Sequence, residues 1–304
     1  MTEQPHNEPP DRSARHEKRH RILQATAVLP SLCTTLNAIS GFGAIHFAFK
    51  ARFDLADGRL LVPANPRDLM IAAGLIFLAM FFDMLDGRLA RMTRKTSEFG
   101  AQLDSLCDAV SFGVAPAVLM LQAVAPLFVY FRAEDMLGAG LSLDRLVWCV
   151  AAVYMSCAVL RLARFNVENA PDESAHMSFR GLPSPGAAAA VAAMTMLYAS
   201  LEKRDALPDA TSLLGVDTLR GIAIVLLPTV TLLAGLLMVS RFRYPHVVNQ
   251  YIRGKRSFMY LVQLVILLLV GLIWPTVTVA AVIMLYVLLG PIGAIIRRVR
   301  RRTT

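Results

Sequence analysis

The stretch DMLDGRLARMTRKTSEFGAQLDSLCD, residues 83–108, places four aspartates in a chain whose other long segments are strongly apolar. A carboxylate inside a bilayer costs about 2.5–3.5 kcal/mol on insertion scales, so four of them in one short stretch need a compensating partner. Membrane proteins use such acids to bind a cation, to line an ion path or to build a catalytic site. The spacing of the acids and the residues around them help to separate these three uses.

The composition is typical of an integral membrane protein. The 304 residues are 56% hydrophobic and 17% charged, whereas soluble domains carry about 25% charged residues. The net charge of +9 could suggest a nucleic-acid partner, but the basic residues lie beside apolar segments. That placement fits the positive-inside rule and contact with anionic lipid headgroups better, so no nucleic acid is expected. The four cysteines show no metal-binding or disulfide spacing.

Apolar segments predict an all-α fold, a polytopic integral membrane helical bundle of about eight transmembrane helices. Each segment supplies about 17–25 residues, enough to cross about 30 Å of hydrocarbon. The segment 184–201 is rich in small residues and should pack against other helices rather than face lipid. Residues 1–22 and 297–304 are expected to be basic tails, the first poorly ordered, on either side of one membrane domain, 23–296. The helices are expected near 27–49, 67–92, 99–130, 144–165, 184–201, 219–240, 257–273 and 276–296.

Basic residues orient the predicted bundle. If the N-terminus is cytoplasmic, the links near 93–98, 166–183 and 241–256 and the C-terminus are cytoplasmic too, and these carry most of the loop arginines and lysines. The opposite links are mixed or nearly neutral. The positive-inside rule therefore predicts that both termini are cytoplasmic and that the aspartate stretch lies at the cytoplasmic face.

The aspartates form two pairs at helical spacing. Asp83 and Asp86 are three residues apart and Asp104 and Asp108 are four apart, so each pair lies on one helix face. Because a basic turn joins the two helices, their acidic faces can converge. Converged carboxylates favour hard divalent cations, Mg²⁺ or Mn²⁺, and two such ions form the usual clamp for displacement at phosphorus. Interfacial salt bridges with nearby arginines, or the ion path of a transporter or channel, are the alternatives.

The residues between the pairs also suit a phosphate-bearing ligand. Gly87 and Ala90 keep one helix surface thin, so a bulky group can approach the backbone. Arg91 offers a fixed positive charge to phosphate oxygens. The whole stretch therefore favours phosphoryl chemistry.

The pattern D-x2-D-G-x2-A-R-x8-G-x3-D-x3-D is met in full from Asp83 to Asp108 and resembles that of the CDP-alcohol phosphotransferases. Its eight fixed positions make it a specific motif. The resemblance implies a helical membrane enzyme that moves a phosphatidyl or phospho-alcohol group from a CDP-linked donor to an acceptor hydroxyl, releasing CMP. It implies two divalent cations held by Asp83, Asp86, Asp104 and Asp108, with Asp108 as the base.

The same resemblance assigns residues to the donor. Gly87, Arg91 and Ser97 match positions that contact the cytidine diphosphate part of it. Asn37 lies in an apolar helix and is expected either to hydrogen-bond between helices or to contact the nucleotide.

Segments outside the motif resemble bacterial membrane-embedded phosphatidylserine synthases, over about residues 27–245. This resemblance implies CDP-diacylglycerol as donor, L-serine as acceptor, a bacterial inner membrane as location and a homodimer as assembly. The segments are Leu29-Pro30 with Thr34, Thr35 and Asn37, QLDSLCDAVSFGVAPA (102–117), LRLARFN (160–166), FRGLPSPGAAA (179–189) and LMVSRFRY (237–244).

The residues themselves leave the acceptor open. Arg161 and Arg164, one turn apart, could bind the carboxylate of serine or a phosphate of the donor, or could only set the topology. Asn166 could orient the acceptor. Glycerol 3-phosphate, inositol or choline are alternative acceptors within the family, and a non-enzymatic ion-binding or transport protein is a more distant alternative.

Overall fold

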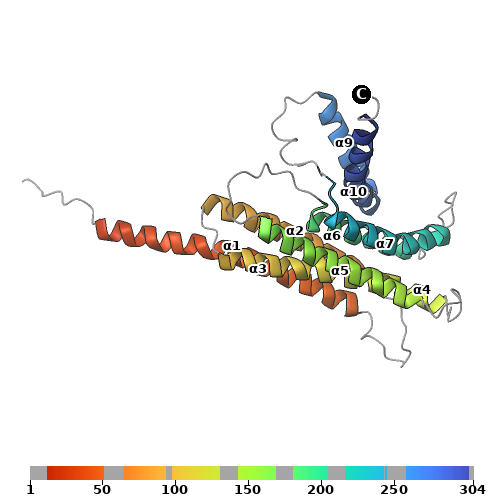
Figure 1. The fold of residues 1–304 in the computed structure, drawn as a ribbon, viewed down its shortest axis with the longest axis horizontal. Helices are drawn as coiled ribbons and strands as arrows, with labels where there is room; N and C mark the ends of the chain where they lie inside the picture. Colours follow the sequence, from red (N-terminus) through yellow and green to blue (C-terminus); the bar gives the residue numbers. More distant parts are fainter. Residues whose placement is uncertain are drawn as a thin grey trace, which may run out of the picture.

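The computed structural model is all-helical, which confirms the predicted fold class (Figure 1). It describes residues 12–50, 65–93, 98–130, 143–168, 181–204, 216–242, 244 and 258–300. In that part of the chain the elements are α1 (Arg12–Lys50), α2 (Pro66–Thr93), α3 (Glu98–Asp108), the π-helical turn η1 (Ala109–Val114), α4 (Ala115–Tyr130), α5 (Leu143–Glu168), α6 (Ser184–Arg204), α7 (Val216–Val239), α9 (Phe258–Ile273) and α10 (Pro275–Arg300).

Seven helices of the described part are long and apolar enough to cross a membrane, so the chain is a multi-pass membrane protein. Eight spans were expected, and α9 accounts for the difference. It lies where a span was predicted, but its 16 described residues are fewer than the roughly 20 that cross the hydrocarbon core. The seven candidates are Pro30–Lys50, Pro66–Leu89, Phe99–Ala125, Leu143–Val167, Ser184–Leu201, Gly221–Val239 and Pro275–Ala294.

Two of the predicted helices differ in detail from the structure. α1 begins at Arg12, so residues 12–22 are helical where the sequence predicted a poorly ordered tail. No glycine or proline interrupts the chain between Arg12 and Leu29, and the helix therefore extends upstream of its apolar part. The predicted helix 99–130 is interrupted by η1, a widened turn that starts directly after Asp108. Such turns occur often at functional sites.

α6 has the buried position that its small residues predicted. Its alanines from Ala187 to Ala190 are all buried, and the helix packs against α2, α4, α7 and α10. Small side chains let neighbouring backbones come close, which compensates for the absence of a hydrophobic driving force between helices in lipid. α6 therefore forms a central helix on which these four helices pack.

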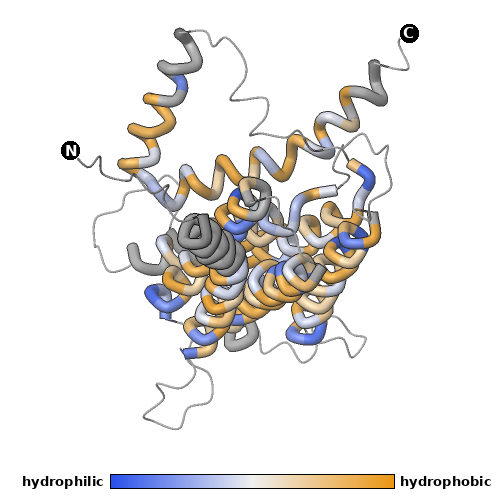
Figure 2. The backbone as a smooth tube through the Cα atoms, turned by 90° about the vertical axis from the view of Figure 1, so that its left-hand side faces the viewer, coloured by the Kyte–Doolittle hydropathy of each residue, from blue (hydrophilic) through white to orange (hydrophobic). Residues whose placement is uncertain are grey.

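The outer sides of the helices are apolar. Figure 2 shows apolar residues along the described helices, and large exposed side chains such as Phe42, Leu106, Trp148 and Leu268 belong to four different helices. In a protein with seven candidate spans these sides are the ones that lipid covers.

α9 and α10 stand outside the rest of the bundle (Figure 1), and α10 is attached through α6. Trp274 is the single residue between them. The hydroxyl of Tyr244 donates to the carbonyl of Val287 at 3.1 Å. Burial, with Tyr286 nearby, raises the pKa of Tyr244 to about 12, so this hydroxyl stays protonated and able to donate.

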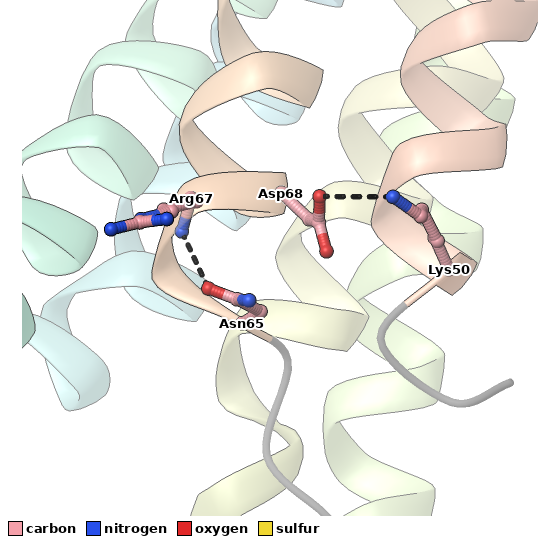
Figure 3. Close-up of polar contacts among 4 residues, drawn as sticks. All are labelled: Lys50, Asn65, Arg67 and Asp68. Atoms are coloured by element: carbon pink, nitrogen blue, oxygen red, sulfur yellow. Dashed lines mark hydrogen bonds and ion pairs between the residues drawn. The ribbon is translucent and has the colours of Figure 1, made fainter. Parts of the chain in front are cut away.

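The end of α1 is fastened to the start of α2 (Figure 3). Lys50 Nζ lies 3.9 Å from Asp68 Oδ1. The side-chain oxygen of Asn65 accepts a hydrogen bond from the backbone N–H of Arg67 at 3.0 Å and caps α2. Asp68 is thus a buried acid with a structural partner, about four helical turns away from Asp83 on the same helix.

A short loop leads into α6 and docks on the end of α7. The backbone N–H of Gly181 donates to the carbonyl of Phe242 at 2.8 Å, and that of Leu182 donates to the carbonyl of Leu237 at 3.0 Å. Gly181 has a φ of +92°, and a Cβ there would collide with the carbonyl oxygen of Met238. Only glycine fits this position.

We therefore expect Gly181→Ala to destabilise the protein. The left-handed backbone costs a residue with a Cβ about 1–2 kcal/mol, and the collision with Met238 adds to that cost. The matched control is Gly74→Ala, because a Cβ at Gly74 meets nothing within 4 Å. Thermal unfolding in detergent should show a lower Tm for Gly181→Ala and an unchanged or higher Tm for Gly74→Ala; equal Tm values would contradict the expectation.

Candidate active site

Three carboxylates meet between α2 and α3. Asp83, Asp104 and Asp108 each offer one oxygen, and these oxygens all lie within 4.8 Å of one another. α1 packs against both α2 and α3. The convergence predicted from the spacing is therefore present, with α1 as an additional wall of the site.

Asp86 lies beside these three acids. It is buried, its charge interacts with that of Asp104, and its carboxyl group is within hydrogen-bonding reach of the Thr34 hydroxyl and the Gly87 backbone. Asp83, one turn earlier on the same helix, interacts with the same neighbour. Asp86 therefore interacts with the cluster of Asp83, Asp104 and Asp108, although its oxygens are not among those that lie within 4.8 Å of one another.

The cluster holds acceptor oxygens that the protein leaves unsatisfied. Within the described residues, Asp86 Oδ2, Asp104 Oδ1 and Asn37 Oδ1 are buried and have no hydrogen-bond partner. A buried polar atom without a partner costs about 1–3 kcal/mol. A divalent cation would satisfy such oxygens and offset the repulsion between the carboxylates, because Mg²⁺ and Mn²⁺ prefer oxygen ligands. The residues present therefore fit a metal site.

Of the basic residues between the two acid pairs, the structure describes only the side chain of Arg88. In the part of the chain that the structure describes, none of the four carboxylates forms an ion pair. Arg88 is exposed. The side chain of Arg91 and residues 94–97, among them Ser97, lie outside the described part.

A partly buried arginine completes one side of the cluster. Arg161 of α5 donates from Nη1 to the hydroxyl oxygen of Ser184 at 2.8 Å, and its Nε is buried without a partner among the described residues. Its charge interacts with those of Asp83 and Asp108. The loop at Gly181 fixes Ser184, the first residue of α6, so a docked loop holds the guanidinium near the acids without neutralising it.

The other predicted site residues have different surroundings. Asn37 is fully buried and donates from Nδ2 to Asp108 Oδ1 at 2.9 Å, which confirms the interhelical hydrogen bond that was one of its two expected roles. Asn166 pairs with Ser105 on α3: its Nδ2 donates to the Ser105 hydroxyl oxygen at 2.9 Å. Arg164 is exposed. A Cβ at Gly87 would meet nothing within 4 Å, so the space predicted there is open.

The sequence did not single out two of the hydroxyls that build the site. Ser184 holds Arg161, and Ser111 of η1 donates to the backbone carbonyl of Asn37 at 2.9 Å. Both lie in segments quoted for their resemblance, but a lone serine in an apolar or proline-containing segment gives no signal of its partner. Their contacts span 23 and 74 residues, so local spacing could not have found them.

Comparison with known proteins adds independent information. A family model described as CDP-alcohol phosphatidyltransferase matches residues 27–219. A protein named CDP-diacylglycerol–serine O-phosphatidyltransferase from Helicobacter pylori is 30% identical over 219 residues, 72% of this chain and 72% of the relative. Proteins of the same name are 34% identical over 173 residues in Mycobacterium tuberculosis, 56% of this chain and 49% of the relative, and 32% identical over 182 residues in Methanocaldococcus jannaschii, 60% and 67%.

Proposed function

The chain belongs to the CDP-alcohol phosphatidyltransferase family, and we propose that it transfers the phosphatidyl group of CDP-diacylglycerol to the hydroxyl of L-serine, releasing CMP. The convergence of Asp83, Asp104 and Asp108 inside a multi-pass helical bundle carries the reaction class. The choice of serine is supported by the names of relatives at 30–34% identity. The place of the reaction in this proposal is the cytoplasmic face of a bacterial inner membrane, in a homodimer.

The four acids would hold two divalent cations, Mg²⁺ or Mn²⁺. When bound, these ions would neutralise the diphosphate of the donor and offset the charge of the leaving group. The chain itself contributes alignment, because Asp83 and Asp86 come from one helix and Asp104 and Asp108 from another. Fixed alignment of reacting groups can lower a barrier by several kcal/mol.

Asp108 is the proposed general base. It is buried, and Asn37 occupies its Oδ1, so Oδ2 is the oxygen that can receive a proton. Asp108 would take the proton of the serine hydroxyl as that oxygen attacks the β-phosphorus. The new bond joins the serine oxygen to the β-phosphorus. The bond from this phosphorus to its bridging oxygen breaks, and CMP leaves with the electron pair.

The donor would lie along α2. The open space beside Gly87 supports this placement, since a nucleotide or diphosphate can approach the backbone there. Arg91 and Ser97, which match donor-contacting positions of the family, would bind the diphosphate and the nucleotide. Asn37 has a buried carbonyl oxygen without a partner among the described residues, and this oxygen could accept a hydrogen bond from the nucleotide.

The acceptor would lie between Asp108 and Arg161. A partly buried guanidinium whose Nε has no partner among the described residues suits the carboxylate of serine, and the interaction of its charge with that of Asp108 supports a location near the base. Arg164 is exposed at the next turn and suits a phosphate of the donor or a lipid headgroup. Asn166 would act through Ser105, which follows Asp104.

A panel of acceptors tests the proposal. Purified protein with CDP-diacylglycerol and Mn²⁺ or Mg²⁺ is given L-serine, glycerol 3-phosphate, inositol or choline, and CMP release is followed. We expect release with serine to exceed that with the other alcohols by about 100-fold, because buried polar groups reject substrates that leave them unpaired. CMP with another alcohol alone would contradict serine as acceptor. Folded protein that releases no CMP with any acceptor would contradict the reaction.

A further inference from the structure

A buried hydrogen bond connects α1 to the proposed base. Asn37 is 0% exposed, and its Nδ2 donates to Asp108 Oδ1 at 2.9 Å across 71 residues of sequence. The acceptor is an acid and the contact is shielded from water, so this bond is stronger than an ordinary surface hydrogen bond.

The backbone of Asn37 is itself fixed. The hydroxyl of Ser111, also 0% exposed, donates to the Asn37 carbonyl at 2.9 Å. One turn along α1, a Cβ at Gly41 would lie 2.7 Å from the Cα of Ser111, so the two backbones approach more closely than any side chain at Gly41 allows. The asparagine therefore has a defined position relative to the turn that follows Asp108.

The widened turn η1 is braced from the other side as well. The hydroxyl of Tyr154 on α5, fully buried, donates to the carbonyl of Phe112 at 3.0 Å. The turn begins at Ala109, directly after Asp108, so the geometry of the turn affects where the Asp108 side chain lies. The backbone of α1, through Ser111, and the Tyr154 side chain of α5 thus hold the turn that follows Asp108.

An aspartate needs such a constraint if it is to act as a base. The terminal torsion of aspartate is broad, so either oxygen could turn toward a cation or a substrate. Occupying one oxygen with a fixed amide orients the carboxylate plane and leaves the second oxygen for the reaction. A misplacement of about 1 Å can cost 100-fold in rate.

We infer that Asn37 is a positioning residue for Asp108. By holding Asp108 Oδ1, Asn37 keeps Asp108 Oδ2 facing the acid cluster. The inference rests on the proposed function and assigns Asn37 an effect on the chemical step through Asp108. A role limited to nucleotide contact, which resemblance also suggests for Asn37, would act on donor affinity instead.

The test compares kcat with KM. Asn37→Leu keeps the branching and the number of side-chain heavy atoms without hydrogen bonding, and Asn37→Asp keeps the shape without the N–H. We expect kcat to fall about 100-fold in both variants while KM for CDP-diacylglycerol and for serine changes by less than about threefold. Mn²⁺ binding, followed by electron paramagnetic resonance, should be retained in Asn37→Leu.

The matched control is Ser40→Ala on the same helix. Ser40 is buried but donates only to the carbonyl of Leu36 within α1, at 2.8 Å, so its loss should leave kcat nearly unchanged. Ser111→Ala removes the bond to the Asn37 backbone and should lower kcat about tenfold at constant KM. This variant also decides the question by the same criteria if Asn37→Leu and Asn37→Asp fail to fold.

Two outcomes would overturn the inference. One is a kcat in Asn37→Leu that stays within about threefold of wild type; the other is a loss confined to KM for CDP-diacylglycerol, which identifies a substrate contact. Failure of the proposed function is distinguishable from both, because the wild-type protein would then release no serine-dependent CMP.

Discussion

Asp108→Asn should lower turnover by about 10²–10⁴-fold, the contribution of a positioned general base, with little change in donor binding. Asparagine keeps the size of the side chain, and its carbonyl oxygen can still accept the hydrogen bond from Asn37. The variant therefore removes the charge and the proton acceptor while preserving the packing. CMP release at saturating substrate measures turnover, and equilibrium binding of CDP-diacylglycerol measures the donor site.

The control for this variant is Asp68→Asn. Asp68 is also a buried acid of the bundle, but its partner is Lys50 at the opposite end of α2 (Figure 3). Its replacement should leave turnover within about threefold of wild type, because this ion pair touches no part of the site. Near-normal turnover in Asp108→Asn would show that another group is the base.

The acid cluster was predictable because it follows from residue spacings within two helices that are consecutive in the sequence. Spacings of three and four residues put Asp83 with Asp86 and Asp104 with Asp108 on single helix faces, and the two helices follow each other closely in the sequence. The buried position of α6 was predictable for the same reason, since its small residues follow one another along the chain. In both cases the pattern that matters lies within one or two helices.

The surroundings of the acids were not predictable, because they depend on contacts between distant segments. Asn37 is 71 residues from Asp108, and the sequence left open whether it would bond a helix or a nucleotide. The turn η1 has the sequence AVSFGV, whose apolar residues fit a regular α-helix. The local sequence therefore did not predict the wider π-helical turn. The partner of Arg161 is set by a loop that docks on α7, and only the three-dimensional packing shows it.

Metal dependence should separate a catalytic site from a cluster of structural acids. Ionised carboxylate oxygens within 4.8 Å of one another repel by at least about 3 kcal/mol per pair at an effective dielectric constant of about 20. Removing divalent cations with a chelator should therefore abolish CMP release and lower the Tm, and adding Mn²⁺ or Mg²⁺ should restore both. At 100 times its Kd, a bound ion stabilises the folded state by about 2.7 kcal/mol.

Asp104→Asn locates this effect. Asp104 Oδ1 is buried without a partner among the described residues. Removing the charge of this carboxylate should therefore abolish both the rise in Tm caused by Mn²⁺ and the recovery of turnover. Asp68→Asn should keep both, because Lys50 already pairs with that acid. A Tm response that survives in Asp104→Asn would place the ion elsewhere, and full turnover in protein shown to be metal-free would exclude a cation from the reaction. A response lost only in Asp104→Asn would show that the cations bind the acids of α2 and α3 and not charges spread over the membrane surface.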